Sequence, residues 1–506
     1  MLTQNNAILR EQLRSQLMEI LQEMDHTVII DGEKDLSPAE KSKQNLLAFL
    51  AFQKFFSQEL EKKLIIQGLT SGHQIHPHVL FSLIRMIDNI SHEKNNAPSS
   101  INILEPSEAT RIKERRICSL LGTNIDSGAN AIMVTLDRRM LHNPNIFAEL
   151  LRAGMTIARI NCAHGSPDTW RQLVRKLREI EEKDREFPRC KIYMDLPGPK
   201  LRITELQKGH SPHITDGAEA TGKTMKLKLQ QHSIIRIYRS ASIPDSHHVE
   251  LPSLAVNLPK ALANVKCGDR VFVDDGKVMA KVVTAQMDYI EAKFIRSHKD
   301  LVTLETEKGL NLPDSLTYLN IPAFTQQDLE CLPIICELAD MIGLSYVHQP
   351  HDIQKLRDQI EHLTSKKIGI VAKIETKASF HHLAKILLEG LDLDSFGIMI
   401  ARGDLAVEMG FEQLAVLQDL IRILCDAAHI PVIWATGVLE KMSKKGIPAR
   451  TEITDLFIGL KADCIMLNKG RYIVDAVQLI KQVNNANPKS HLEVRNFLFP
   501  YVQYGF

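Results

Sequence analysis

The sequence predicts an α/β fold: a closed (β/α)8 TIM barrel with a small all-β domain inserted in it and an α-helical extension before it. From about residue 131, eight short apolar runs alternate with segments of helical periodicity. A strand–helix unit repeated eight times closes into a parallel barrel, and the count of eight favours closure over an open doubly wound sheet, which is the alternative. One long interval interrupts the alternation with strand-like segments alone, and this interval predicts the inserted domain.

The composition is that of a soluble globular chain. The 506 residues are 44% hydrophobic and 24% charged, and 62 basic against 61 acidic side chains give a net charge of +1. This balance provides no global attraction to nucleic acid or to an anionic membrane, and no apolar run approaches the ~20 residues that span a bilayer. The eight cysteines form no Cys-x-x-Cys pair, which is typical of free thiols in a reducing compartment. With no signal-peptide pattern, we expect a cytoplasmic protein that binds neither nucleic acid nor membrane.

Four regions are expected along the chain. They are an N-terminal helical extension (residues 1–125), the barrel (126–202 and 308–490), the inserted β domain (203–307) and a C-terminal tail (491–506). The extension contains no constellation that suggests chemistry. Its helices pack on the barrel, pair with a second subunit or bind a partner, and self-association into a homo-oligomer stays open.

Helices in the extension follow from periodicity and caps. Apolar residues recur at three- and four-residue steps between Leu9 and Met24 and make one apolar stripe. Ser37-Pro38-Ala39-Glu40 is a capping box that starts a second helix, which we expect to end at Gly68. A third helix is expected after Pro77 and a fourth from 108 to 121.

The barrel elements follow in order. Strands are expected at 131–136, 156–160, 191–195, 341–347, 368–374, 397–401, 431–435 and 464–467. Helices are expected between most of them, at 145–153, 167–183, 327–338, 353–363, 379–389 and 412–428. The inserted β domain follows the C-terminal end of the third strand. That end is the active face of such barrels, so the insertion is placed to act as a lid.

Lys373 and Glu375 end the fifth strand and point to the same side of it. Alone, this pair would be interpreted as a buried ion pair at a strand terminus. The ends of the other strands, however, also carry polar residues, among them Arg159, Asp195 and Asp404. Glu375 and Asp404, on adjacent strands, are within range of one divalent metal, and hard oxygen ligands beside lysine and arginine suit magnesium completed by a substrate phosphate. Phosphoryl transfer needs this set of charges.

Six ordered motifs resemble those of pyruvate kinase. They are Ala158-Arg-Ile-Asn-Cys-Ala-His-Gly165, Met194-Asp-Leu-Pro-Gly-Pro-Lys-Leu-Arg202, Lys308-Gly-Leu-Asn-Leu-Pro313, Ala372-Lys-Ile-Glu375, Ile400-Ala-Arg-Gly-Asp-Leu405 and Trp434-Ala-Thr436. The resemblance covers about residues 130 to 485 and includes the inserted β domain. It implies the reaction of phosphoenolpyruvate with ADP to give pyruvate and ATP, with Mg²⁺ or Mn²⁺ as cofactor.

The resemblance also implies roles for single residues. Arg159 would hold the substrate phosphate, Lys373 would stabilise the phosphoryl group in flight, and Thr436 would contact the substrate carboxylate. Glu375 and Asp404 would bind magnesium, with the Gly403 backbone at the substrate. Residues that would face the nucleotide are His164, Arg202 and Lys308. Residues at the monovalent-cation corner are Asn161, Asp195 and Lys200.

That corner departs from the family pattern. Ala163 stands where the family commonly has a serine, Leu196 where it has a threonine, and Lys200 where it usually has a glutamate. Ala163 removes an oxygen ligand, and Lys200 brings in an ammonium. We therefore expect Lys200 to supply the positive charge that potassium would otherwise provide. Some family members that resemble this chain at the lysine position work without potassium, and the resemblance implies potassium-independent activity.

Other departures lie beside the site. Pro197 and Gly437 replace a lysine and a glutamine, and the turns after the fourth and eighth strands have become Ser345-Tyr-Val-His348 and Asn468-Lys469-Gly470. These changes, with the added helices, favour a rival hypothesis, a catalytically weak or inactive binding or regulatory protein of pyruvate kinase type. A third hypothesis is a barrel enzyme with different chemistry on a similar substrate. The retained Lys373, Glu375 and Asp404 favour the kinase.

A second phosphate-binding signal is set aside. Gly217-Ala-Glu-Ala-Thr-Gly-Lys-Thr224 satisfies the phosphate-loop pattern letter for letter. That mechanism needs a buried strand before the loop and a helix after it. The preceding residues cannot form a core strand, and the following ones alternate like an edge strand. A solvated turn in the β domain is the better interpretation.

Overall fold

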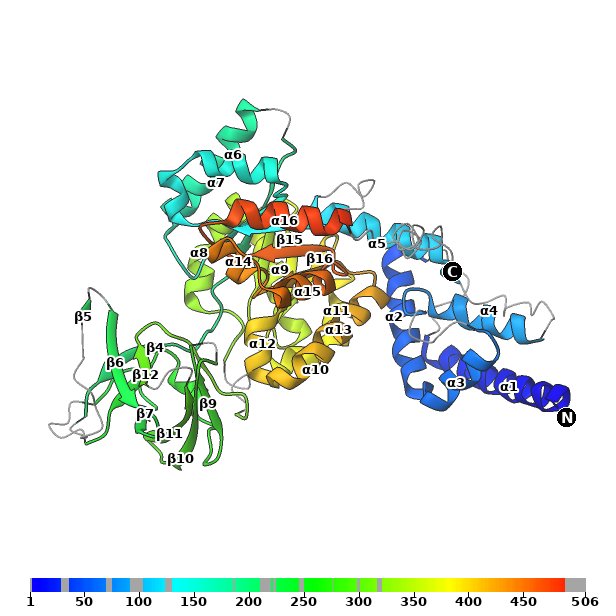
Figure 1. The fold of residues 1–506 in the computed structure, drawn as a ribbon, viewed down its shortest axis with the longest axis horizontal. Coiled ribbons are helices and arrows are strands. Elements are labelled where there is room, and N and C mark those ends of the chain that lie inside the picture. The colour runs from blue at the N-terminus through cyan, green and yellow to red at the C-terminus, as the bar shows by residue number, and fades with distance from the viewer. Residues whose placement is uncertain are drawn as a thin grey trace, which may run out of the picture.

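The computed structural model describes residues 2–28, 36–69, 75–91, 103–122, 130–184, 187–209, 220–221, 224–244, 250–274, 276–297, 301–315 and 321–486. The predicted C-terminal tail and most of the phosphate-loop pattern lie outside these residues. The molecule is elongated, with the β domain at one end, the barrel in the middle and the N-terminal helices at the other end (Figure 1). Within the described part of the chain, no helix combines the length and the apolarity needed to cross a lipid bilayer.

Eight parallel strands form a closed barrel in the order β1-β18-β17-β16-β15-β14-β3-β2. They are β1 (Ala131–Thr135), β2 (Ile157–Asn161), β3 (Lys191–Asp195), β14 (Met341–Leu344), β15 (Gly369–Ile374), β16 (Phe396–Ala401), β17 (Val432–Ala435) and β18 (Cys464–Leu467). The (β/α)8 barrel that the sequence predicts is therefore confirmed, and the strands start and end within a few residues of the expected positions.

Helices surround the barrel. They are α6 (Asn145–Ala153), α7 (Pro167–Lys183), α8 (Gln326–Leu338), α9 (Pro350–Leu363), α10 (Lys377–His381), α11 (Leu383–Gly390), α12 (Arg402–Met409), α13 (Phe411–Ala427), α14 (Glu440–Lys445), α15 (Arg450–Gly459) and α16 (Ile473–Ala486). The prediction of a single helix at 379–389 is wrong. The chain bends at His382, whose Nδ1 lies 2.7 Å from the His348 carbonyl, and α10 and α11 are separate helices.

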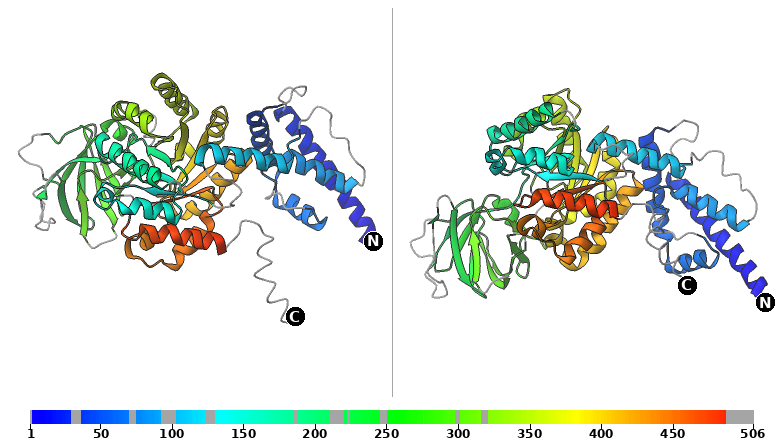
Figure 2. Two further views of the ribbon diagram at one scale, coloured as in Figure 1. Left: turned by 90° about the horizontal axis from the view of Figure 1, so that it is seen from above. Right: turned by 45° about the horizontal axis from the view of Figure 1, so that its top comes forward.

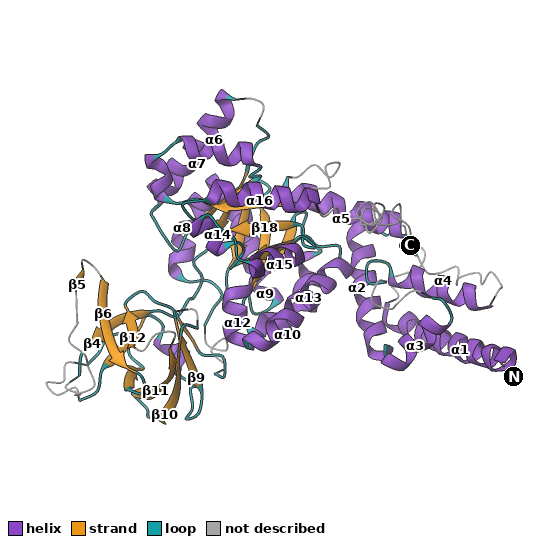
Figure 3. Cartoon of the chain, viewed as in Figure 1, coloured by secondary structure: helices purple, strands orange, loops and turns teal. Residues whose placement is uncertain are grey.

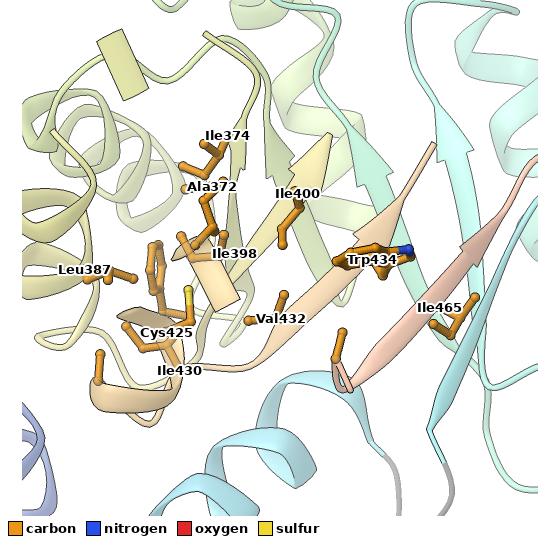
Figure 4. Close-up of a cluster of buried hydrophobic side chains, with 14 of the residues drawn as sticks. Ala372, Ile374, Leu387, Ile398, Ile400, Cys425, Ile430, Val432, Trp434 and Ile465 are labelled. Carbon is orange, nitrogen blue, oxygen red and sulfur yellow. The ribbon is translucent and has the colours of Figure 1, made fainter. Parts of the chain in front are cut away.

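Alternate residues of the strands face two different cores. Ile398 and Ile400 of β16, with Val432 and Trp434 of β17, point outward and pack against the helices, as Figure 4 shows. Met399 and Ile433, between them in sequence, belong to a separate cluster inside the barrel. Both sides of each strand are buried, which explains why the barrel strands appear in the sequence as continuous apolar runs.

The inserted strands lie between β3 and α8 in the chain. They are β4 (Ile203–Gln207), β5 (Ala220–Thr221), β6 (Thr224–Gln230), β7 (Ile234–Tyr238), β8 (Ser253–Val256), β9 (Arg270–Val273), β10 (Val278–Ala285), β11 (Tyr289–Ser297), β12 (Leu301–Glu305) and β13 (Leu310–Asn311). They form a seven-stranded and a three-stranded sheet with a core of their own. β6, which the sequence suggested was an edge strand, is the middle strand of the smaller sheet.

The N-terminal extension is helical and contains no strand among its described residues (Figure 3). Its helices are α1 (Leu2–Val28), α2 (Pro38–Phe55), α3 (Gln58–Ile66), α4 (Val79–Ser91) and α5 (Pro106–Leu121). The capping box at Ser37 is confirmed, since Ser37 Oγ accepts from the Glu40 N–H and the Glu40 carboxylate accepts from the Ser37 N–H. The helix expected to run to Gly68 is instead divided, because Ser57 has an extended backbone and its side chain caps α3.

Helix α5 joins the N-terminal helices to the barrel (Figure 2). Its last residues, Leu120 and Leu121, are buried and belong to the same cluster as the inward-facing residues Met133 and Met399 of the barrel strands. The extension thus closes the face of the barrel opposite the strand C-termini, and it leaves the C-terminal face to the β domain.

Candidate active site

A cavity of about 540 Å³ lies at the C-terminal ends of the barrel strands, beside the β domain. Most of the residues predicted for the site line it: Arg159, Asn161, His164, Lys200, Arg202, Lys308, Lys373, Glu375, Asp404 and Thr436. Asp195 lies beneath it and is 1% exposed. The barrel therefore brings together residues that are up to 277 positions apart in the sequence (159 to 436).

Lys373 is at the centre of the buried polar groups. Its Nζ lies 2.8 Å from Glu375 Oε1 and 3.6 Å from Asp195 Oδ1, and it donates a hydrogen bond of 2.9 Å to Ser345 Oγ. Burial disfavours the charge on this amine, but Asp195 and Glu375 outweigh that effect and raise the pKa of Lys373. Lys373 is therefore a fixed cation.

Arg159 is held by the carboxylate below the cavity. Its Nε donates to Asp195 Oδ2 at 2.6 Å, and its Nη1 donates to Thr135 Oγ1 at 2.8 Å. The Tyr193 hydroxyl donates to the other oxygen of Asp195 at 2.6 Å. Burial would raise the pKa of Asp195, yet Arg159 and Lys373 lower it, so the carboxylate is charged. Asp195 thus fixes Arg159 by a hydrogen bond and Lys373 by an ion pair.

Glu375 and Asp404 are the two candidate metal ligands. Glu375 is 2% exposed, and its Oε2 accepts from the Tyr346 N–H at 2.8 Å. Burial raises the pKa of Glu375, Lys373 opposes the shift, and the negative charge of Asp404 adds to it. A divalent cation between the carboxylates would relieve this repulsion.

The donor set fits magnesium. The described residues contain no group of three or more His, Cys, Asp or Glu side chains that could hold a metal ion on their own. Two carboxylates beside a cavity leave the remaining positions to water and substrate oxygens. Mg²⁺ is usually bound in this way, by one or two carboxylates together with a phosphate.

Lys200 forms an ion pair that was not predicted from the sequence. Its Nζ lies 3.0 Å from Asp404 Oδ1, and the family resemblance groups it with Asn161 and Asp195. The Asn161 Oδ1 atom accepts from the Ala163 N–H at 3.1 Å, and Asp195 is bound by Arg159, Tyr193 and Lys373. Lys200 thus pairs with the candidate metal ligand Asp404.

Thr436 follows β17 in a strained turn. Its φ angle is +70°, in the left-handed region that non-glycine residues rarely adopt. Arg402 holds the turn, because its Nε donates to the Ala435 carbonyl at 3.0 Å and its Nη2 to the Thr436 carbonyl at 2.7 Å. A Cβ atom at Gly403 would lie 2.7 Å from Thr436 Cγ2. Glycine is therefore needed for the close approach of the two segments.

The three residues predicted to face a nucleotide are basic groups at the cavity wall. Lys308 Nζ lies 3.0 Å from Asp274 Oδ1 of the β domain, and Arg202 Nη1 donates to the Glu307 carbonyl at 3.0 Å. Partial burial, and then the cations Lys469 and Arg202, lower the pKa of His164. His164 is thus held neutral next to fixed positive charge.

Three residues that orient side chains of the site were not predicted from the sequence. Thr135 orients Arg159, Tyr193 orients Asp195, and Tyr346 donates its backbone N–H to Glu375 from a left-handed conformation with φ +54°. Tyr193 had a signal in the sequence, because it lies two residues before Asp195 and points to the same side of the strand. The backbone conformation of Tyr346 had no signal in the sequence.

The fold and this cluster define a (β/α)8-barrel protein with a buried lysine between carboxylates at the strand ends. Residues 129–477 match the family described as pyruvate kinase, barrel domain. The chain therefore belongs to the pyruvate kinase family.

Curated relatives are similar over the same part of the chain. Pyruvate kinase of Thermococcus litoralis is 30% identical over 342 residues, 66% of this chain and 65% of its own length. Pyruvate kinase of Geobacillus stearothermophilus is 28% identical over 344 residues, 66% of this chain and 53% of its own. The chain thus spans about two thirds of the first relative and about half of the second.

Proposed function

We propose that the protein transfers the phosphoryl group of phosphoenolpyruvate to ADP, giving pyruvate and ATP, with Mg²⁺ or Mn²⁺ bound. The observation that carries this proposal is the position of Lys373, a buried cation that lines the cavity 2.8 Å from Glu375. Phosphoryl transfer depends on fixed positive charge and positioning more than on covalent chemistry. Membership of the family supports the same reaction.

The substrate end of the site is assigned to four residues. Arg159 would bind the phosphate, and Lys373 would stabilise the charge on the phosphoryl group as it moves between the two oxygens. The Gly403 backbone and the Thr436 side chain would orient the substrate carboxylate. Asp195 is a positioning residue, because it holds Arg159 and Lys373 by the contacts described above.

Glu375 and Asp404 would hold the divalent cation. When bound, the cation neutralises charge on the phosphate oxygens and orients them. The polar cluster as a whole is balanced, since Arg159, Lys200 and Lys373 face Asp195, Glu375 and Asp404. A metal and an anionic substrate that enter together therefore disturb the charge of the cluster less than either alone.

The nucleotide is assigned to the side of the cavity that carries His164, Arg202 and Lys308. Arg202 and Lys308 flank the two connections between barrel and β domain. Residues 203–307 would therefore act as a lid that excludes water when the nucleotide binds. Residues 1–125 would form a separate helical extension on the opposite face.

Activity without potassium is part of the proposal. Ala163 and Leu196 offer no side-chain oxygen at the cation corner, and both line the cavity. The Lys200 ammonium supplies a permanent positive charge at its edge. The covalently attached ammonium of Lys200 would replace the potassium ion that other family members bind from solution.

The test is pyruvate formation from phosphoenolpyruvate and ADP with Mg²⁺, for wild type, Lys373→Met and a matched control, Lys385→Met, at an exposed position of α11. We expect turnover in wild type and in the control, and a loss of about a hundredfold or more in Lys373→Met. Absence of turnover in the wild type, with other nucleoside diphosphates also tried, would overturn the reaction and favour a binding protein.

A further inference from the structure

Lys200 lies at the point where the chain passes from the barrel to the β domain. Its carbonyl accepts from Asn257 Nδ2 of the β domain at 3.0 Å. The returning segment runs beside it, since Leu310 N–H donates to the Leu201 carbonyl at 2.8 Å. A Cβ atom at Gly309 would lie 2.8 Å from Lys200 Cε. The lysine side chain thus passes over a glycine between the two connecting segments.

The far end of the same side chain reaches the barrel. Lys200 Nζ lies 3.0 Å from Asp404 Oδ1, and the two side chains are only 18% and 21% exposed. An ion pair that is shielded from water in this way is stronger than one on the surface. Lys200 therefore connects the root of the β domain to a carboxylate on α12.

Asp404 is also the carboxylate that the proposed function gives to the divalent cation. The other candidate ligand, Glu375, is already bound by Lys373 and by the Tyr346 N–H. A divalent cation at Asp404 would meet the Lys200 ammonium at the same carboxylate. Two cations there repel each other.

We propose that Lys200 is a positioning residue that ties the β domain to Asp404 and competes with a divalent cation for that carboxylate. Metal binding then weakens the tie, and the tie weakens metal binding, because the coupling of two binding events is reciprocal. The metal part of this inference rests on the proposed function, whereas the tie between the two domains does not.

The experiment uses the full chain, as wild type, Lys200→Met and the control Lys226→Met. Lys226 pairs with Glu305 at 2.9 Å within the β domain. Hydrogen exchange of residues 197–203 and 306–312 is measured without metal. We expect it to become at least about tenfold faster in Lys200→Met and to be unchanged in Lys226→Met.

Mn²⁺ binding without substrate is measured on the same proteins by electron paramagnetic resonance, which detects the free ion. We expect Lys200→Met to bind Mn²⁺ about tenfold more tightly than wild type and Lys226→Met. Mn²⁺ should accelerate hydrogen exchange of the two connecting segments in wild type and leave it unchanged in Lys200→Met.

Unchanged hydrogen exchange of the connecting segments in Lys200→Met would show that Lys200 does not connect the β domain to Asp404. Mn²⁺ binding by Lys200→Met that is equal to or weaker than that of wild type would show that Lys200 does not compete with the metal. Absence of Mn²⁺ binding in every protein would overturn the competition and the metal site together. Failure to form pyruvate, with faster exchange and tighter Mn²⁺ binding in Lys200→Met, would refute the proposed reaction and support this inference.

Discussion

Leu120 of α5 packs against the backbone of Gly397 on β16. A Cβ atom at Gly397 would overlap Leu120 Cδ2, and one at Gly369 would lie 2.7 Å from Leu120 Cδ1. Two barrel strands therefore carry glycine where the last turn of the N-terminal helices enters the barrel. The end of α5 is therefore part of the barrel core, on the face opposite the cavity.

Leu120→Ala should destabilise the barrel by about 2–5 kcal/mol, because it leaves a cavity among buried residues. The measurement is the free energy of unfolding in urea. Leu363→Ala, on a side chain that is 44% exposed, is the control and should cost far less. A cost for Leu120→Ala no larger than that of the control would show that α5 does not support the barrel.

His429 joins the barrel to the N-terminal helices through both ring nitrogens. Nε2 lies 2.9 Å from the Pro77 carbonyl and Nδ1 lies 3.0 Å from Ser42 Oγ. The ring is 1% exposed, and burial, together with the cations Arg116 and Lys113, lowers the pKa of His429 to about 4. The interface therefore holds a neutral imidazole.

This lowered pKa makes the fold sensitive to acid. Between about pH 6.5 and pH 4 the unfolded chain binds a proton at His429 that the folded chain does not, so stability is lost as the pH falls through this window. The loss should approach about 3 kcal/mol. Urea unfolding at pH 7.5 and 4.5 measures it, and His429→Gln should show a smaller difference between the two pH values. An equal difference in wild type and variant would contradict this assignment.

The sequence was a good guide to the barrel for a physical reason. Strands buried on both sides appear as continuous apolar runs, and their polar ends mark the cavity. Lys373 and Glu375 could be placed on one side because the strand period is two. At the breaks at Ser57 and His382 a side chain contacts a backbone group, and such contacts leave no periodic signal.

Contacts between distant segments were not accessible from periodicity. The packing of Leu120 on Gly397 joins positions that are 277 residues apart, and nothing local in either segment marks it. The pairing of Lys200 with Asp404 was missed for another reason. A flexible lysine can reach several carboxylates, and the resemblance suggested only that Lys200 supplies positive charge at the cation corner.

Gly403→Ala should reduce the kcat/KM for phosphoenolpyruvate by about tenfold to a hundredfold. The added Cβ would lie 2.7 Å from Thr436 Cγ2 and displace the side chain that we assign to the substrate carboxylate. Thr436→Ser removes that methyl group, so Gly403→Ala should cost much less when it is combined with Thr436→Ser, as steady-state kinetics of the double-mutant cycle would show. If Gly403→Ala lowered kcat/KM equally with and without Thr436→Ser, its effect would not come from the contact with the Thr436 methyl group.

Potassium should have little effect on turnover by the wild-type protein. The ammonium of Lys200 is a fixed charge at the cavity, and Ala163 and Leu196 provide no side-chain oxygen for a monovalent cation. Turnover in a sodium-only buffer should therefore be within about twofold of turnover in potassium, whereas Lys200→Glu should lose most of its activity in sodium. Lys385→Glu, at an exposed position of α11, controls for the change of charge and should behave as wild type. If potassium raised wild-type turnover manyfold, the lysine would not be the substitute for the cation, and its role would be confined to the pairing with Asp404.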